Sequence, residues 1–169
     1  NVTRIILSKL HFGCKKKAED SQLLTPNPSL LTNLDYANNF NIEHSENYTT
    51  LSIFSPWDNA GVLYTYYLVK NDTIKTPNDG VKIKVPLQNI AVNSCSHVAY
   101  IDALGLATKI VASTDPGYVY NENFRNLLEA GKIENLGGSY DMNFEKILKV
   151  SPEVLMVTGF KGVDNMAIR

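Results

Sequence analysis

The sequence predicts an α/β fold: a parallel-sheet domain over residues 86–169, with an N-terminal β-hairpin addition over residues 43–85. The parallel-sheet domain is predicted by three short apolar runs, at 89–92, 109–112 and 152–157. They lack the alternation of a half-exposed strand, and helical patterns separate them, which indicates a sheet buried on both faces. The hairpin is predicted by two β-rich runs joined by turn residues.

Composition limits the class of protein. With 169 residues the chain is long enough for one domain with its own core, and its hydrophobic share of 44% and charged share of 20% are typical of globular proteins. The net charge of -1, from 16 basic and 17 acidic residues, provides no overall field for nucleic acid or an anionic membrane. We therefore expect no nucleic-acid partner.

The amino-terminal segment indicates export. Residues 1–14 contain a basic Arg4, the apolar run 5–7 and a glycine directly before Cys14, and a polar run follows. This pattern resembles the remnant of a bacterial lipoprotein signal, whose cysteine becomes lipidated, although Lys9 and His11 interrupt the apolar stretch. The alternative is that Cys14 is an incidental thiol. Residues 15–42, rich in Asn, Ser, Thr and Pro, are predicted to be a polar tether. A lipid at Cys14 is the only membrane attachment expected.

The folded part begins with β-structure. Residues 48–55 are predicted to be a strand, 56–61 a turn and 62–70 a second strand containing three tyrosines. A further short strand at 81–85 ends at Pro86, which cannot donate to a strand ladder.

After Pro86 strands and helices alternate. The strand at 89–92 leads into a helix over about 97–103, capped by Ser94 or Ser96 and ended by Gly105. Later segments repeat the pattern, with a strand at 109–112, helices at 121–130 and 143–150, and a strand at 152–157. In open parallel sheets the ligand crevice lies beyond the carboxyl ends of the strands, here 93–97, 113–118 and 158–162.

The turn at residues 93–97 combines hydroxyl, thiol and imidazole groups. Three interpretations stay open: helix capping around a buried Cys95, a ligand-lining loop using Ser96 and His97, or a nucleophile pairing Cys95 with His97. No catalytic residue is assigned. The three histidines are scattered and the two cysteines form no CxxC pair, so no metal site is predicted, and any metal should arrive already chelated. Tyr118 and Tyr140 fall in or near crevice loops, where they either contact ligand or cap the core.

Four motifs, in order, resemble the periplasmic binding proteins of ABC importers for iron siderophores, haem and cobalamin, over residues 86–162. They are the strand and helix of 87–105, which ends in Ala-Leu-Gly, the strand of 107–112, the loop and helix of 137–148, and the strand of 151–157. The hairpin strand 64–69 and the Cys14-Lys-Lys-Lys start resemble such proteins from Bacteroidetes.

The resemblance implies a solute-binding protein, not an enzyme, that captures an Fe(III) chelate (siderophore or haem) or a corrinoid and delivers it to a membrane permease. It implies a monomer without an intrinsic cofactor, lipid-anchored in the periplasm or at the cell surface. The family has two α/β lobes joined by a long helix, so residues 86–169 are expected to form the first lobe, with the second lobe absent. The expected ligand-facing residues are Ser96, His97, Tyr118 and Tyr140, and Glu145 is expected to dock against the permease.

Two other classes of function stay open. One is a hydrolytic α/β enzyme using Cys95 and His97, and the other is a structural or partner-binding surface domain. Within the transport class, cobalamin is the alternative to an iron complex.

Overall fold

A computed structural model describes residues 3–7, 37–56 and 61–159 of the chain. The fold is α/β, as predicted, and the chain divides into two compact units, one of residues 1–8 and 86–169 and the other of residues 9–85. The second part of the first unit begins at Pro86, the residue at which the sequence predicts that the α/β domain begins.

The first unit contains a five-stranded parallel sheet in the order β1, β9, β6, β7, β8. Its strands are β1 (Thr3–Leu7), β6 (Ile90–Val92), β7 (Ile110–Ser113), β8 (Glu134–Asn135) and β9 (Val154–Thr158). The three predicted apolar runs become β6, β7 and β9, whose β-branched side chains suit a sheet buried on both faces. Strand β8 was not predicted, because two polar residues carry no strand pattern and their conformation depends on pairing with β7.

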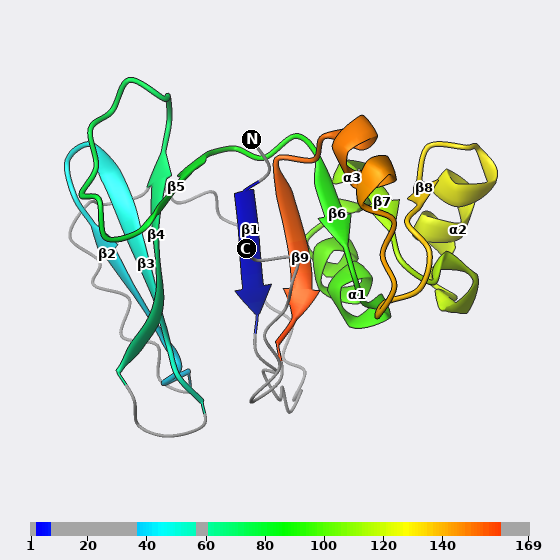
Figure 1. The fold of residues 1–169 in the computed structure, drawn as a ribbon, viewed down its shortest axis with the longest axis horizontal. Helices are drawn as coiled ribbons and strands as arrows, with labels where there is room; N and C mark the ends of the chain where they lie inside the picture. The colour runs from blue at the N-terminus through cyan, green and yellow to red at the C-terminus, as the bar shows by residue number, and fades with distance from the viewer. Residues whose placement is uncertain (1–2, 8–36, 57–60, 160–169) are drawn as a thin grey trace, which may run out of the picture. The chain divides into compact units, whose positions relative to one another are not determined.

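Helices connect these strands and flank the sheet (Figure 1). They are α1 (Cys95–Ala103), α2 (Glu122–Glu129) and α3 (Phe144–Val150), with the short 3₁₀ helices η1 (Ala107–Lys109) and η2 (Pro116–Tyr118). Each α-helix begins after a side-chain cap, provided by Ser94, Asn121 and Asn143 respectively. The cap of α1 is therefore Ser94 and not Ser96, and the helix begins at Cys95, two residues before the predicted start.

The core of this unit lies between the sheet and the helices. Its buried side chains come mainly from the central strands and from one face of each helix, and the fully buried ones include Val92, Val98, Ile110, Phe124, Leu155 and, directly after β8, Leu136. At the amino end of the sheet, the Glu153 carboxylate accepts hydrogen bonds from the backbone N–H groups of Gln88 and Asn89.

The second unit contains a four-stranded sheet in the order β2, β3, β4, β5. The predicted hairpin is confirmed as the antiparallel pair β3 (Tyr48–Phe54) and β4 (Val62–Val69). It is joined by β2 (Phe40–His44) and by β5 (Val81–Lys84), which pairs parallel to β4. The Tyr67 hydroxyl donates to the Asp79 carboxylate, and this bond raises the pKa of Tyr67 to about 12.

Two predicted boundaries near the amino terminus need correction. The tether predicted over 15–42 extends too far, because residues 40–42 belong to strand β2, where Phe40 and Ile42 face the same way and pair with Ile53 and Leu51. Within 1–14, the segment predicted as an export signal, residues 3–7 form strand β1 beside β9. Apolar, β-branched residues suit a strand as well as a signal core. Processing itself stays a prediction, since Cys14 and residues 8–36 lie outside the described residues.

Candidate functional site

The order of the parallel strands reverses between β6 and β9. From β6 the chain moves to β7 and then β8 on one side, and it returns to place β9 on the other side of β6. At such a reversal the connections leave in opposite directions and open a crevice beyond the carboxyl ends of the two strands. Here that point is bounded by Asn93, directly after β6, and by Thr158, the last residue of β9.

Asn93 connects three segments at this reversal. Its side chain is 8% exposed. The Nδ2 group donates to the backbone oxygen of Ser139 at 2.8 Å and lies 3.7 Å from the sulfur of Met142. Its Oδ1 accepts from the backbone N–H of Thr158 at 3.3 Å. A buried amide whose nitrogen donates and whose oxygen accepts a hydrogen bond fixes the spacing of the groups that it bonds.

Asp115 makes a second connection from the end of β7. Its backbone N–H donates to Gly137 O at 2.8 Å, and its carboxylate accepts hydrogen bonds from both the backbone N–H and the hydroxyl of Ser139. The Ser139 hydroxyl also lies 3.2 Å from that of Thr114. The loop before α3 is thus bonded to the ends of β6 and β7.

The amino end of α1 lies at the same edge of the sheet, since it directly follows β6. Cys95 and Ser96 are exposed there, whereas His97 is 4% exposed. Burial lowers the pKa of His97 to about 4, and its Nδ1 has no hydrogen-bond partner among the described residues. The imidazole is therefore neutral at neutral pH.

These positions correct two expectations for residues 93–97. Cys95 is not the buried residue of the capping interpretation, because it occupies the first position of α1 and faces solvent. His97 does not lie on an open rim, because it shares the buried face of α1 with Val98 and Ile101. No hydrogen bond joins Cys95 to His97 among the bonds of the described residues, so the structure gives no support to a thiolate–imidazole pair.

The other predicted rim residues are exposed. Tyr118 is 74% and Tyr140 is 94% exposed, so neither caps the core. Tyr118 ends η2 after β7, Ser96 is in the first turn of α1 after β6, and Tyr140 follows Ser139, which is bonded to Asn93 and Asp115. Ser96, Tyr118 and Tyr140 thus come from segments at the carboxyl end of the sheet, as does the exposed Tyr120.

Sequence reasoning located this edge but missed the residues that organise it. Asn93 and Asp115 lie inside the predicted crevice segments 93–97 and 113–118, but the sequence pattern does not distinguish them from their neighbours. Their position, directly after or close to the end of an apolar strand, was the available signal. Their common partner Ser139 lies in a loop whose place only the fold reveals.

Glu145 occupies the first turn of α3, after the Asn143 cap, where the helix dipole favours a carboxylate. It is exposed, and no hydrogen bond or ion pair joins it to any described residue. The adjacent Lys146 is engaged elsewhere, because its ammonium group lies 2.9 Å from the Glu134 carboxylate and donates to Asn135 O. The Glu145 carboxylate is therefore available to a partner.

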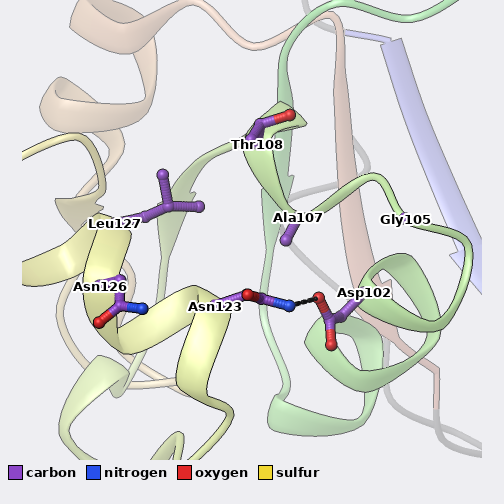
Figure 2. Close-up of a pocket in the computed structure, with 7 residues that line it drawn as sticks. All are labelled: Asp102, Gly105, Ala107, Thr108, Asn123, Asn126 and Leu127. Atoms are coloured by element: carbon purple, nitrogen blue, oxygen red, sulfur yellow. Dashed lines mark hydrogen bonds between the residues drawn. The ribbon is translucent and has the colours of Figure 1, made fainter.

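A separate hollow of about 380 Å³ lies between α1, η1 and α2 (Figure 2). Figure 2 shows the Asn123 amide directed at the Asp102 carboxylate, to which it donates at 2.7 Å. Asn121 donates to the other oxygen of Asp102 at 2.7 Å, and the two bonds lower the pKa of Asp102. These bonds join the start of α2 to α1. None of the predicted rim residues lines this hollow.

The described part of the chain contains neither a cluster of metal-ligating side chains nor a helix suited to cross a membrane. Within residues 3–7, 37–56 and 61–159, no three His, Cys, Asp or Glu side chains gather closely enough to hold a metal ion. In the same segments no helix combines the length and the apolar character needed to cross a bilayer.

No protein-family model matches the chain. Over 191 aligned residues the chain is 26% identical to a protein of Methanocaldococcus jannaschii named as an uncharacterized lipoprotein. The alignment covers 94% of this chain and 45% of that protein, so the chain spans less than half the length of the relative it matches. The name describes the relative as a lipoprotein and does not mention a ligand.

Proposed function

We propose that this chain forms one wall of the solute-binding component of an ABC importer, which captures an iron complex, a siderophore or haem, and delivers it to a membrane permease. The observation that carries the proposal is the strand reversal at β6 and β9, whose carboxyl edge presents exposed Ser96, Tyr118 and Tyr140. The four motifs that resemble the binding-protein family fall on the elements that build this edge. The two-lobe arrangement and the second wall are part of the proposal.

The chemistry of the edge suits a chelate better than a bare metal ion. Tyrosine combines a large apolar face with a hydroxyl, which allows contact with the organic shell of a chelate and hydrogen bonding to its polar groups. The described residues offer no cluster of metal-ligating side chains. A corrinoid is the alternative ligand with the same needs.

The membrane attachment is also a proposal. The lipoprotein name of the archaeal relative supports a lipid anchor, which we place at Cys14, before the tether and the folded units; processing there would remove residues 1–13 and with them strand β1. Mass spectrometry of the protein from the membrane fraction should find a lipid on Cys14, and Cys14→Ser should release the protein into the soluble fraction. Recovery of an unmodified Cys14 from membranes would contradict the anchor.

The ligand is tested with the full natural protein that contains this chain. It is expressed under iron limitation and purified without denaturation, and copurifying small molecules are identified by mass spectrometry. The protein freed of ligand is then titrated with hemin, ferric desferrioxamine and cyanocobalamin. We expect one of these classes to bind, with weaker binding by Tyr118→Ala and Tyr140→Ala and unchanged binding by Tyr100→Ala. Tyr100 is the matched control, because it is an exposed tyrosine in the middle of α1.

The other functional classes predict different results. An enzyme should turn over simple esters and lose that activity in Cys95→Ser. A structural or partner-binding domain should bind none of the three chelates. Either result would overturn the transport proposal.

A further inference from the structure

The loop that carries Tyr140 is closed by its own backbone. Residues 137–142, called here the Tyr140 loop, begin at Gly137 and end at Met142, and these two residues form an isolated antiparallel bridge. Asn143 N–H donates to Leu136 O at 2.7 Å. Gly137 has φ +90, and a Cβ there would lie 3.0 Å from Asp141 O, so glycine is required. The loop is therefore closed at its base by backbone contacts, with Tyr140 exposed on it.

Side chains outside the loop determine where it lies. Asn93 holds the loop to β6 and β9, because it donates to Ser139 O and accepts from Thr158 N–H. Asp115 holds it to β7 through the N–H and hydroxyl of Ser139. Ser139 directly precedes Tyr140; it accepts a hydrogen bond from Asn93 and donates two to the Asp115 carboxylate.

The left-handed backbone conformation of Asp115 indicates that its bonds to the Tyr140 loop hold it in place. Asp115 has φ 44 and ψ 44, the left-handed conformation, which is uncommon for a residue other than glycine and less so for Asp than for most. A strained conformation persists where its surroundings hold it. Here the Asp115 N–H bond to Gly137 O and the carboxylate bonds to Ser139 hold it.

We propose that Asp115 and Asn93 are positioning residues of the ligand-facing edge, which hold the Tyr140 loop at the strand reversal and so fix where Tyr140 meets the ligand. This inference rests on the proposed function for the identity of the ligand, but the position of the loop can be tested without ligand. A side chain held in place before binding loses less conformational freedom on binding, which increases affinity. Loss of either positioning residue should weaken chelate binding about 2- to 10-fold, the range expected for ordering one side chain.

The position of the loop is measured first in the protein without ligand. Backbone hydrogen exchange of Ser139 reports its bond to Asp115, and 3-fluorotyrosine NMR reports the environment of residue 140. Asp115→Ala should increase the exchange rate of Ser139 about tenfold or more, the factor expected for loss of a hydrogen bond to a charged group. It should also shift or broaden the Tyr140 signal, while amides of β6 and β9 keep their protection. Asp115→Asn should recover most of the wild-type behaviour, because asparagine keeps an acceptor oxygen and tolerates the left-handed conformation.

Asp141→Ala is the matched control. Asp141 is an exposed carboxylate in the same loop, and its side chain makes no hydrogen bond or ion pair with a described residue. If Asp115→Ala and Asn93→Ala both change Ser139 exchange and the Tyr140 signal no more than Asp141→Ala does, the inference is overturned. This result does not depend on which ligand binds.

A double-mutant cycle with ligand separates positioning from a general structural effect. Hemin, ferric desferrioxamine and cyanocobalamin serve as probes for wild type, Asp115→Ala, Tyr140→Ala and the double variant. Positioning through Tyr140 requires that Asp115→Ala weaken binding in the wild type and have little further effect after Tyr140→Ala. An equal effect in both backgrounds would refute it. If wild type binds no probe, the proposed function fails, and the exchange and NMR measurements alone decide the position of the loop.

Discussion

The buried His97 makes the stability of the first unit depend on pH in a defined direction. Burial lowers its pKa to about 4 in the folded protein, whereas the unfolded chain protonates it near its ordinary pKa of 6.5. Between about pH 4 and 6.5 the unfolded state therefore binds more protons than the folded state. The contribution of His97 to the free energy of unfolding should be fully present above pH 6.5 and should be lost as the pH drops through this window.

The size of this loss follows from the difference between the two pKa values. At 1.36 kcal/mol per pKa unit, the change from 6.5 to about 4 corresponds to about 3 kcal/mol. At its steepest, the slope of the free energy of unfolding against pH should approach the value for one extra proton bound by each unfolded molecule. This is a large fraction of the 5–15 kcal/mol that stabilises a typical domain.

Urea denaturation at a series of pH values between 7.5 and 4.5 measures this dependence. Carboxylates also titrate in the lower part of the range, so wild type is compared with His97→Leu, which removes the titrating group and the unpartnered Nδ1. The difference in free energy of unfolding between the two proteins should change by most of the expected 3 kcal/mol across the series. His44→Leu, which removes the exposed histidine of β2, is the control. Parallel curves for wild type and His97→Leu would refute the reasoning.

Three further predictions concern single side chains. Phe124→Ala, which empties a fully buried position in α2, should lower the free energy of unfolding by about 3–5 kcal/mol in urea denaturation, whereas the exposed Asn126→Ala should change it by less than about 0.5 kcal/mol. Glu153→Gln weakens two charge-assisted bonds at the start of β9 and should cost about 1–2 kcal/mol in the same assay; an effect as small as that of Asn126→Ala would contradict this. On the proposed transport function, Glu145→Ala in the full natural protein should leave chelate affinity intact and reduce uptake, and Glu145→Arg should reduce uptake further by like-charge repulsion at the proposed permease. Unchanged uptake in both variants would leave Glu145 with its helix-dipole role alone.

The predicted elements agree best with the structure where the burial of a segment can be recognised from its own residues. The apolar runs that became β6, β7 and β9 signal a sheet covered on both sides, whatever their neighbours are. Helix caps are similarly local, because a capping side chain bonds a backbone N–H two or three residues away. Strands β2 and β8 escaped prediction for the opposite reason, since polar or isolated residues become strands only by pairing with a partner.

The same distinction applies to the site. The sequence by itself predicted that the segments 93–97, 113–118 and 158–162 follow strand ends and that Tyr118 and Tyr140 belong to or lie near them. Only the tertiary structure decided that α1 turns Ser96 outward and His97 inward, and that Asn93 and Asp115 both bond to Ser139, 46 and 24 residues away. Periodicity in a sequence indicates which residues of a helix or strand share its buried face. Hydrogen bonds between distant segments depend instead on strand order and helix rotation. Those are set by packing of the whole core, and no single segment specifies them.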